Sequence, residues 1–331
     1  MNRMPEPVID FVCMADSKYG KWLSLCIRAI QRFHPNSRIY VFDLSPESNT
    51  IAACCSVFDN IVHVPFPSSE WRYPSWIDKA NFSFFWPRFT IRETIKYWTR
   101  RLRHHATRRT KEGWMIDKEL HVQKMRLFCR IVSLKPHILI RALELSQRNI
   151  AFIDVDAIVL KSLTQVFDSF FDIAITCEDP KDIVISANPP ECADRPAYPI
   201  RAVNTGVIFL RNGTATTEFL SDWISEMDSV YDTSTEQTAL ANLVFKISPK
   251  FFIEYPPLTS TLVISNRHTV LVKKLPMNTY NKINFDIAAK ESQNGVYILH
   301  FVGSKKQEKN WGIVSNYIEQ SILLNKYTSI E

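Results

Sequence analysis

The sequence predicts an α/β fold with a mostly parallel central sheet flanked by helices. Strand-like and helix-like patterns alternate over the first 65 residues, which is typical of parallel βαβ units. An acidic pair follows a later apolar run that has the pattern of a buried strand. The 331 residues, 46% of them hydrophobic and 22% charged, suffice for one large core or two smaller ones.

Five elements are expected before residue 66. The apolar residues of the first helix recur at helical spacing and end before Pro35, whereas the neighbouring apolar runs are short, as in strands. The expected elements are a strand at 8–14, a helix at 22–33, a strand at 38–43, a helix at 48–58 and a strand at 61–64. The turn after the first strand has no Gly-x-Gly-x-x-Gly, which excludes the dinucleotide-binding fingerprint.

Residues 66–130 interrupt this alternation. They begin with prolines and aromatic residues and continue with nine lysines and arginines between residues 88 and 111. Aromatic and aliphatic residues interleave with these charges, which indicates one or two amphipathic helices. We therefore predict a single domain over residues 1–331 with a basic, aromatic, helical insertion at 66–130.

The regular pattern resumes near residue 132. Pro136 favours a helix start at that residue because proline suits the first helical turn. The five prolines of 178–200 indicate a loop, and Gly206 marks a polar interruption in the strand that follows. The remaining expected elements are helices at 136–145, 217–230, 234–243 and 314–324, and strands at 150–153, 171–176, 202–211 and 295–301.

The seven cysteines predict free thiols in a reducing compartment. Their number is odd, no Cys-x-x-Cys occurs, and most lie in apolar runs, so neither a disulfide framework nor a structural zinc site is expected. No stretch of 18 apolar residues predicts a membrane-spanning helix, and the N-terminus lacks a signal-peptide pattern. We therefore expect a cytoplasmic protein.

The pair Asp154 and Asp156 is the strongest chemical signal in the sequence. Side chains at i and i+2 leave a strand on the same side, so the two carboxylates are expected to lie close together. Like charges held that close repel unless a cation lies between them. Hard oxygen ligands favour Mg²⁺ or Mn²⁺, although Asp-x-Asp also occurs by chance in solvated loops.

Five motifs then occur in order along residues 8–311, and together they identify a resemblance. They are Ala15-Asp16-Ser17-Lys18-Tyr19; Lys135-Pro136; Phe152-Ile153-Asp154-Val155-Asp156-Ala157; Asn204-Thr205-Gly206-Val207-Ile208-Phe209-Leu210-Arg211; and Thr235-Glu236-Gln237-Thr238-Ala239-Leu240-Ala241 with His300-Phe301-Val302-Gly303-Ser304-Lys305-Lys306. With them the chain resembles the retaining GT-A (Rossmann-like) glycosyltransferases of families 8 and 77. The range 66–130 departs from that pattern.

The resemblance implies a nucleotide-sugar donor, a UDP-sugar in the first instance, and a bound Mn²⁺ or Mg²⁺. It implies that Asp156 and His300 bind the metal and that Asp154 binds the metal or the ribose. Asp16 and Tyr19 would contact the nucleobase, with Lys135 near the donor. Gly303, Lys305 and Lys306 would approach the diphosphate. The implied catalytic residues, close to the sugar, are Asn204 and one of Glu236 and Gln237.

Each of these residues also has a plain structural interpretation. His300 on an apolar strand could be a core histidine, Lys135 a surface lysine, and Asp16 and Tyr19 turn and packing residues. Asn204 and Gly206 could form a simple bulge. Glu236 could merely complement a helix N-terminus.

The function expected from the resemblance is transfer of a hexose or pentose to a glycan or glycolipid hydroxyl, with retention. The alternatives are a nucleotidyltransferase and a non-catalytic glycan- or membrane-binding module on a transferase scaffold. The basic segment 88–111 fits an anionic membrane surface, which suits a lipid-linked glycan acceptor and a peripheral position on the cytoplasmic membrane face. It could equally be a solvated face or cover the donor site. No nucleic-acid-binding motif is present, so no nucleic acid is expected as a partner.

Overall fold

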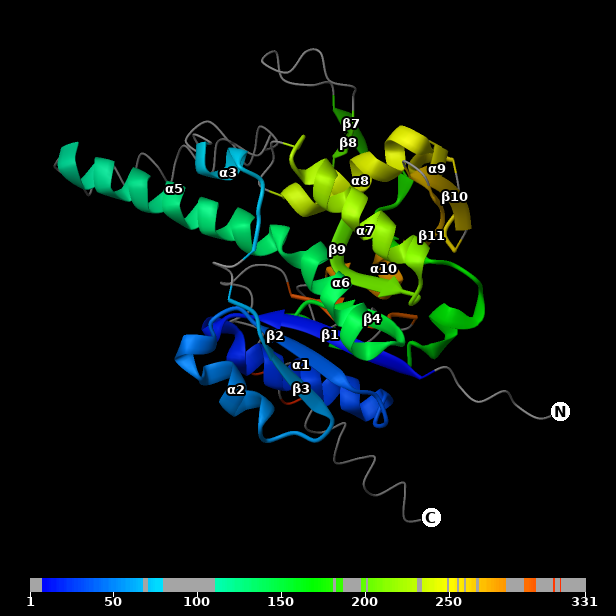
Figure 1. Cartoon of the computed structure of the whole chain (residues 1–331), viewed down its shortest axis with the longest axis horizontal. Coiled ribbons are helices and arrows are strands. Elements are labelled where there is room, and N and C mark those ends of the chain that lie inside the picture. Colours follow the sequence, from blue (N-terminus) through cyan, green and yellow to red (C-terminus); the bar gives the residue numbers. More distant parts are fainter. Residues whose placement is uncertain are drawn as a thin grey trace.

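The computed structural model contains a central eight-stranded sheet with the strand order β10-β11-β6-β9-β4-β1-β2-β3 (Figure 1). It describes residues 8–67, 71–79, 111–180, 183–186, 198–200, 202–230, 234–248, 250–254, 256–258, 260–265, 268–283, 295–301, 312 and 316. Side chains of α5 are described from residue 122.

The N-terminal elements match the sequence expectation. β1 (Ile9–Ala15), β2 (Ile39–Asp43), β3 (Ile61–Pro65) and β4 (Asn149–Ile153) pair in parallel. α1 (Gly20–Phe33) and α2 (Thr50–Cys55) connect the first three strands. Because β1 and β4 are parallel neighbours, their carboxyl ends lie at the same edge of the sheet.

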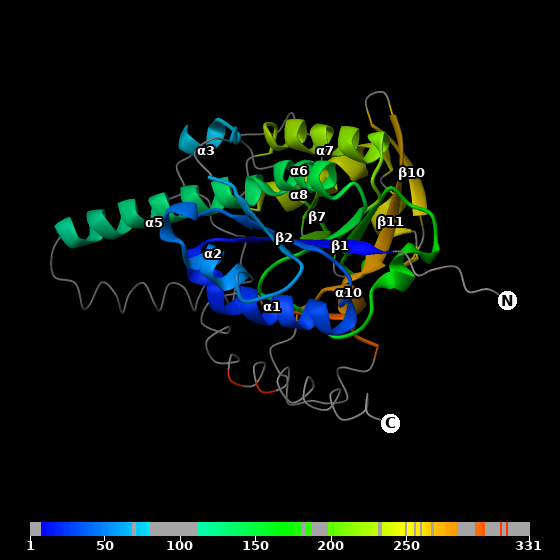
Figure 2. The ribbon, with the colours of Figure 1, turned by 60° about the horizontal axis from the view of Figure 1, so that its bottom comes forward.

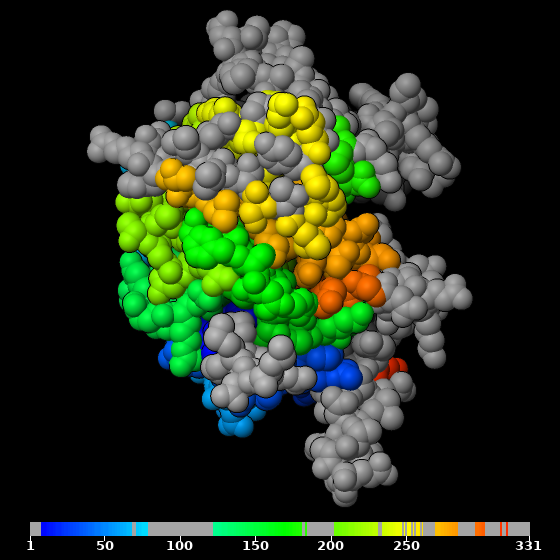
Figure 3. All heavy atoms as spheres, turned by 90° about the vertical axis from the view of Figure 1, so that its right-hand side faces the viewer, coloured from blue at the N-terminus to red at the C-terminus, as the bar shows by residue number. Residues whose placement is uncertain are grey.

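The second half of the sheet is mixed. β9 (Val203–Leu210) is antiparallel to β4 and to β6 (Ile173–Cys177), whereas β11 (His268–Pro276) is parallel to β6 and antiparallel to β10 (Ser260–Ser265). β10 and β11 are absent from the sequence prediction. On the face seen in Figure 3, the orange residues of this region lie beside the green residues of η4 (Thr164–Asp168).

Helices cover both faces of the sheet (Figure 2). α1 and α2 pack on one face in a core that includes Phe11, Cys13 and Ile153. α6 (Lys135–Ser146), α7 (Thr214–Met227) and α8 (Thr235–Ile247) cover the other face. Successive residues of β1 therefore belong to different cores, as the period of a strand requires.

The structure corrects one expectation about the irregular regions and covers only part of another. The range 178–200 is not all loop, because β7 (Val184–Ser186) and β8 (Tyr198–Ile200) form an antiparallel hairpin. Within the expected insertion, α3 (Trp76–Lys79) packs against α5 (Lys111–Ser133), which extends away from the sheet in Figure 1. The basic residues 88–110 and most of the expected C-terminal helix lie outside the described residues.

The remaining elements are short. They are η1 (Ser17–Tyr19), η2 (Pro46–Ser48), α9 (Lys250–Ile253), α10 (Met277–Tyr280), β5 (Ala157–Val159), β12 (Lys282–Ile283) and β13 (Ile298–His300). Six cysteines are free, and Cys192 lies outside the described residues. Among the helices that the structure describes, none is long and apolar enough to cross a membrane.

Candidate functional site

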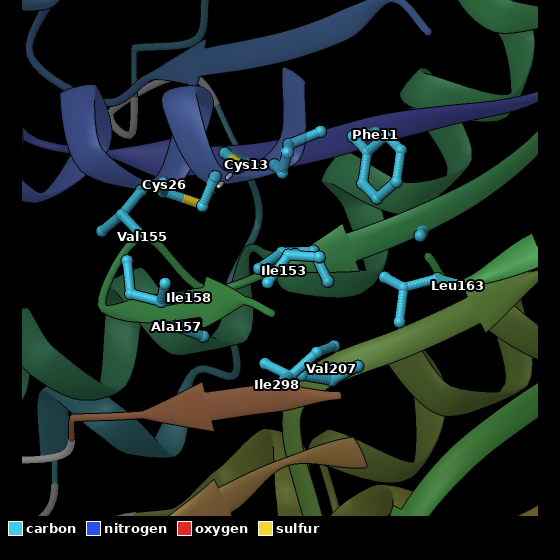
Figure 4. Close-up of a cluster of buried hydrophobic side chains, with 14 of the residues drawn as sticks. Phe11, Cys13, Cys26, Ile153, Val155, Ala157, Ile158, Leu163, Val207 and Ile298 are labelled. Carbon is cyan, nitrogen blue, oxygen red and sulfur yellow. Dashed lines mark hydrogen bonds between the residues drawn. The ribbon is translucent and has the colours of Figure 1, made fainter. Parts of the chain in front are cut away.

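The two acids of the Asp-x-Asp motif lie in the turn between β4 and β5. The turn is closed by backbone hydrogen bonds, because Asp154 N donates to Gly206 O at 2.8 Å and Ala157 N donates to Asp154 O at 2.8 Å. Val155 and Ala157 are buried in the α1-side core (Figure 4). The carboxylates of Asp154 and Asp156 alternate with these apolar residues and keep 23% and 15% of their side-chain surface exposed.

His300 reaches this turn through the small sheet formed by β12, β13 and β5. β13 pairs antiparallel with β5, so that His300 faces Ala157, and Phe301 N donates to Asp156 O at 2.9 Å. The ring atom Nε2 of His300 lies 3.1 Å from Asp156 Oδ1 and 3.9 Å from Asp154 Oδ2. One ligand atom from each of the three residues lies within 4.8 Å of the others.

The charge state of His300 follows from these neighbours. Burial by itself would lower the pKa of His300, but the hydrogen bond and charge of Asp156, and then the charge of Asp154, raise that pKa above its ordinary value. A positive charge between the two carboxylates is therefore favoured, whether it is a proton on the imidazole or a bound cation. Two carboxylate oxygens and an imidazole nitrogen are also a donor set that suits Mn²⁺.

Lys135 is not a surface lysine, because only 2% of it is exposed. Its ammonium group donates to Asp154 Oδ1 at 3.2 Å, Thr205 O at 2.9 Å and Thr205 Oγ1 at 3.2 Å. It also lies 4.7 Å from the centre of the Phe152 ring. All three N–H groups of the ammonium have an acceptor, so Lys135 fixes the positions of Asp154 and Thr205 relative to each other.

Glu236 continues this hydrogen-bonded chain. Its Oε1 accepts a hydrogen bond from Thr205 Oγ1 at 3.1 Å, while Oε2 is buried without a partner among the described residues. Burial raises the pKa of Glu236, an effect that the charge of Lys135 offsets in part. Gln237, the next residue of α8, is half-buried and therefore more accessible than Glu236.

Asn204 and Gly206 form the bulge that their sequence suggested. The register between β6 and β9 shifts at Ile175 and Thr176, and Gly206 N donates to Asn204 Oδ1 at 2.8 Å. Asn204 Oδ1 also accepts a hydrogen bond from Asn281 Nδ2 at 2.9 Å. The side-chain oxygen of Asn204 thus already accepts two hydrogen bonds within the protein, and the Nδ2 group is the part of Asn204 that can donate to a ligand.

Asp16 and Tyr19 lie beyond the carboxyl end of β1, at the sheet edge that also carries Asp154. The carboxylate of Asp16 accepts from Lys18 N at 2.9 Å and caps η1, and Tyr19 packs in part against the α1-side core. Turn and packing roles are therefore observed for both residues. Gly303, Lys305 and Lys306 lie outside the described residues.

With this geometry established, the comparison with known families is decisive. The model of the nucleotide-diphospho-sugar transferase family matches residues 93–310, more than half of the chain. The chain belongs to this family. The matched segment contains Lys135, Asp154, Asp156, Glu236 and His300, but not the first three strands.

The chain is also similar, at low sequence identity, to solved structures of glycosyltransferases. WbbM, a bifunctional glycosyltransferase, has a TM-score of 0.45 at 12% identity, over 92% of this chain and 47% of its own. The galactosyltransferase LgtC has a TM-score of 0.40 at 14% identity, over 89% of this chain and 87% of its own. GlyE from Streptococcus pneumoniae has a TM-score of 0.45 at 12% identity, over 97% of this chain and 63% of its own. No curated protein sequence matches the chain.

Family membership and the observed sheet confirm two expectations from the sequence. The protein is a glycosyltransferase of the nucleotide-sugar transferase class and therefore an enzyme. Its fold is the expected α/β arrangement, with a central sheet flanked by helices. Membership decides against the nucleotidyltransferase alternative.

Three residues of the site were not singled out from the sequence: Thr176, Thr205 and Asn281. Thr205 stands inside a motif that we quoted, between Asn204 and Gly206. Thr176 and Asn281 carry no local signal, because only the pairing of β6 with β9 and the turn after α10 bring them together.

Proposed function

We propose that the protein transfers a hexose or pentose from a UDP-sugar to a glycan or glycolipid hydroxyl, with Mn²⁺ or Mg²⁺ as cofactor and with retention at the anomeric carbon. The observation that carries this proposal is the cluster of Asp154, Asp156 and His300 at the carboxyl edge of the parallel strands. Open α/β sheets bind their ligands at that edge.

Asp154, Asp156 and His300 are the proposed metal ligands. A divalent cation at this position supplies electrostatic stabilisation for the negative charge that develops on a diphosphate leaving group. The protein's part is to hold the ligands at close range before the cation binds. Lys135 orients Asp154, and the packing of Val155 and Ala157 against the core keeps the turn between β4 and β5 in its shape.

The geometry supports Gln237 rather than Glu236 as the residue of α8 that faces the sugar. Glu236 is buried, accepts a hydrogen bond from Thr205 and has a raised pKa. Its ionised form is therefore disfavoured, and it is poorly suited to stabilise positive charge at the reaction centre as a carboxylate. Gln237 is half-buried and offers a carbonyl oxygen and an amide group. Asn204 would donate from Nδ2 to a sugar hydroxyl.

Retention without a covalent intermediate is the route we favour. A double displacement needs an ionised carboxylate placed at the anomeric carbon. Glu236 is an acid that hydrogen bonds connect to the cluster through Thr205 and Lys135, and its burial disfavours the ionised form. We therefore propose front-face attack, with the leaving diphosphate accepting the proton of the acceptor hydroxyl.

The roles at the two ends of the donor rest on the sequence resemblance. Asp16 and Tyr19 would contact the uracil ring, with Gly303, Lys305 and Lys306 at the diphosphate.

The charge of residues 88–111 supports a contact with an anionic membrane and a lipid-linked glycan acceptor in the cytoplasm. Liposomes with and without anionic lipid test this contact, and loss of co-sedimentation in physiological salt would refute it.

Calorimetry of UDP binding with and without Mn²⁺ tests the core of the proposal. We expect UDP to bind tightly only when Mn²⁺ is present, and Asp156→Asn to lose the Mn²⁺-dependent part. Hydrolysis of a panel of nucleotide-sugars then identifies the donor, and NMR of the product reports its anomeric configuration. UDP binding that does not respond to Mn²⁺ would overturn the metal role, and an inverted product would overturn retention.

A further inference from the structure

Asn281 is the second hydrogen-bond partner of His300. It follows α10, is fully buried, and its Oδ1 lies 2.8 Å from His300 Nδ1. Its Nδ2 lies 3.0 Å from Thr176 Oγ1 and 2.9 Å from Asn204 Oδ1. Every polar atom of this buried side chain therefore has a partner, and one partner is the proposed metal-binding histidine.

Two backbone groups determine which way the amide of Asn281 points. Gly206 N can only donate, so the atom of Asn204 that faces it, at 2.8 Å, is the carbonyl oxygen. The backbone carbonyl of Asn204 can only accept, so the hydroxyl of Thr176 donates to it, at 2.7 Å. Both Asn204 Oδ1 and Thr176 Oγ1 are thus left as acceptors toward Asn281, and the atom of Asn281 that faces them must be the NH₂ group.

The other end of the Asn281 amide is then a carbonyl oxygen, which can only accept. His300 Nδ1 must donate to it and therefore carries a proton. In the neutral imidazole this places the lone pair on Nε2, the ring atom that lies 3.1 Å from Asp156 Oδ1. The lone pair thus faces the carboxylate of the cluster, where a cation is needed to offset repulsion.

We propose that Asn281 is a positioning residue that holds His300 in its Nδ1-protonated tautomer and so presents Nε2 to a divalent cation. The proposal rests on the metal site of the proposed function. A ligating histidine that is oriented through its other ring nitrogen binds its metal more tightly, and loss of such a partner costs about 10–100-fold in affinity. Backbone groups of the bulge in β9 fix the orientation of the Asn281 amide, and this amide in turn fixes the tautomer of His300 on β13.

The tautomer can be observed without any metal. Protein labelled with ¹⁵N in its eight histidines is studied at a pH where the neutral imidazole predominates, and His300 is assigned by comparison with His300→Gln. We expect the proton of His300 on Nδ1 in the wild type. A wild-type spectrum with the proton on Nε2 overturns the proposal directly, whatever the behaviour of any variant.

Variants separate the positioning role from a merely structural one. Asn281→Leu removes the acceptor at similar volume, so we expect the proton to move to Nε2, where it can bond Asp156, and Mn²⁺ affinity measured by electron paramagnetic resonance to fall about 10–100-fold. Asn281→Asp keeps an acceptor at Nδ1, so the Nδ1-protonated tautomer and most of the affinity should remain. Asn242→Leu makes the same change at a half-buried asparagine that bonds Glu226, and serves as the matched control.

The outcomes distinguish this proposal from the proposed function. If Asn281→Leu keeps both the wild-type tautomer and the wild-type Mn²⁺ affinity, Asn281 has no positioning role. If Asn281→Leu does not fold, the wild-type tautomer and Asn281→Asp still decide. If the wild type itself binds no Mn²⁺, the metal site of the proposed function fails, and the tautomer remains a separate result.

Discussion

Gly206 lies so close to His300 that a Cβ atom at residue 206 would be 2.4 Å from Cε1 of the imidazole ring. The same atom would be 2.9 Å from Asp154 Oδ2. The space beside residue 206 is therefore occupied by two of the proposed metal ligands. The glycine at this position therefore lets two side chains of the protein approach the backbone of β9.

Gly206→Ala should consequently displace His300 or Asp154. We expect a loss of about 1–3 kcal/mol in the free energy of unfolding from overpacking, together with at least tenfold weaker Mn²⁺ binding, about the cost of disturbing a ligand's support. Urea unfolding and electron paramagnetic resonance measure the two effects. Gly213→Ala is the control, because its φ of 174° is extended and a Cβ there would meet nothing within 4 Å. Equal Mn²⁺ affinity in the two variants would contradict this account.

Asp156→Asn keeps the shape of the side chain and removes its charge. Mn²⁺ affinity should fall at least about tenfold, since a direct ligand matters no less than a supporting residue. The free energy of unfolding should change by no more than about 1 kcal/mol, because lost attraction to His300 is offset by relief of repulsion from Asp154. Asp228→Asn, at a half-exposed surface pair, is the control. A variant that retains wild-type Mn²⁺ affinity would remove Asp156 from the site.

The parts of this fold that the sequence predicts are those with local periodicity. β1, α1, β2, β3 and β4 follow from apolar runs, and the acidic pair lies at the predicted strand end. β11 was missed because it joins the sheet by pairing with β6, about 100 residues away, and β10 was missed with it because β10 pairs with β11. Asn281 was missed for a similar reason, since its role arises from contacts with His300 and Asn204 that no sequence spacing reveals.

Glu236 should make stability depend on pH. Burial raises the pKa of Glu236 above its ordinary value, so the folded state holds the proton more tightly than the unfolded state does. The stability of the wild type relative to Glu236→Gln is then greatest below the ordinary pKa of glutamate and falls as the pH rises through the folded pKa. Urea unfolding of both proteins across this range measures the difference.

The control for this pH dependence is Glu254→Gln, because the side chain of Glu254 is 55% exposed and pairs with Lys250 at the surface. The decrease of stability with pH should be larger for the Glu236→Gln comparison than for this control, because burial raises the pKa of Glu236. An equal pH dependence in the two comparisons would contradict a raised pKa for Glu236.

Lys135→Met should test the hydrogen-bonded chain from Asp154 to Glu236. The substitution leaves Thr205 O and Asp154 Oδ1 without their donor, and we expect a loss of about 2 kcal/mol in the free energy of unfolding. Lys250→Met, which breaks an exposed pair with Glu254, should cost at most about 1 kcal/mol. The charge of Lys135 lowers the pKa of Glu236, so removing that charge should raise this pKa further.

A double-mutant cycle between Lys135→Met and Glu236→Gln measures that link. The coupling energy should grow as the pH rises, because Lys135 attracts Glu236 only when the carboxyl group is ionised. At low pH the two substitutions should be closer to additive, with Thr205 as their remaining shared partner. A coupling energy that does not change with pH would show that Lys135 and Glu236 communicate through packing alone.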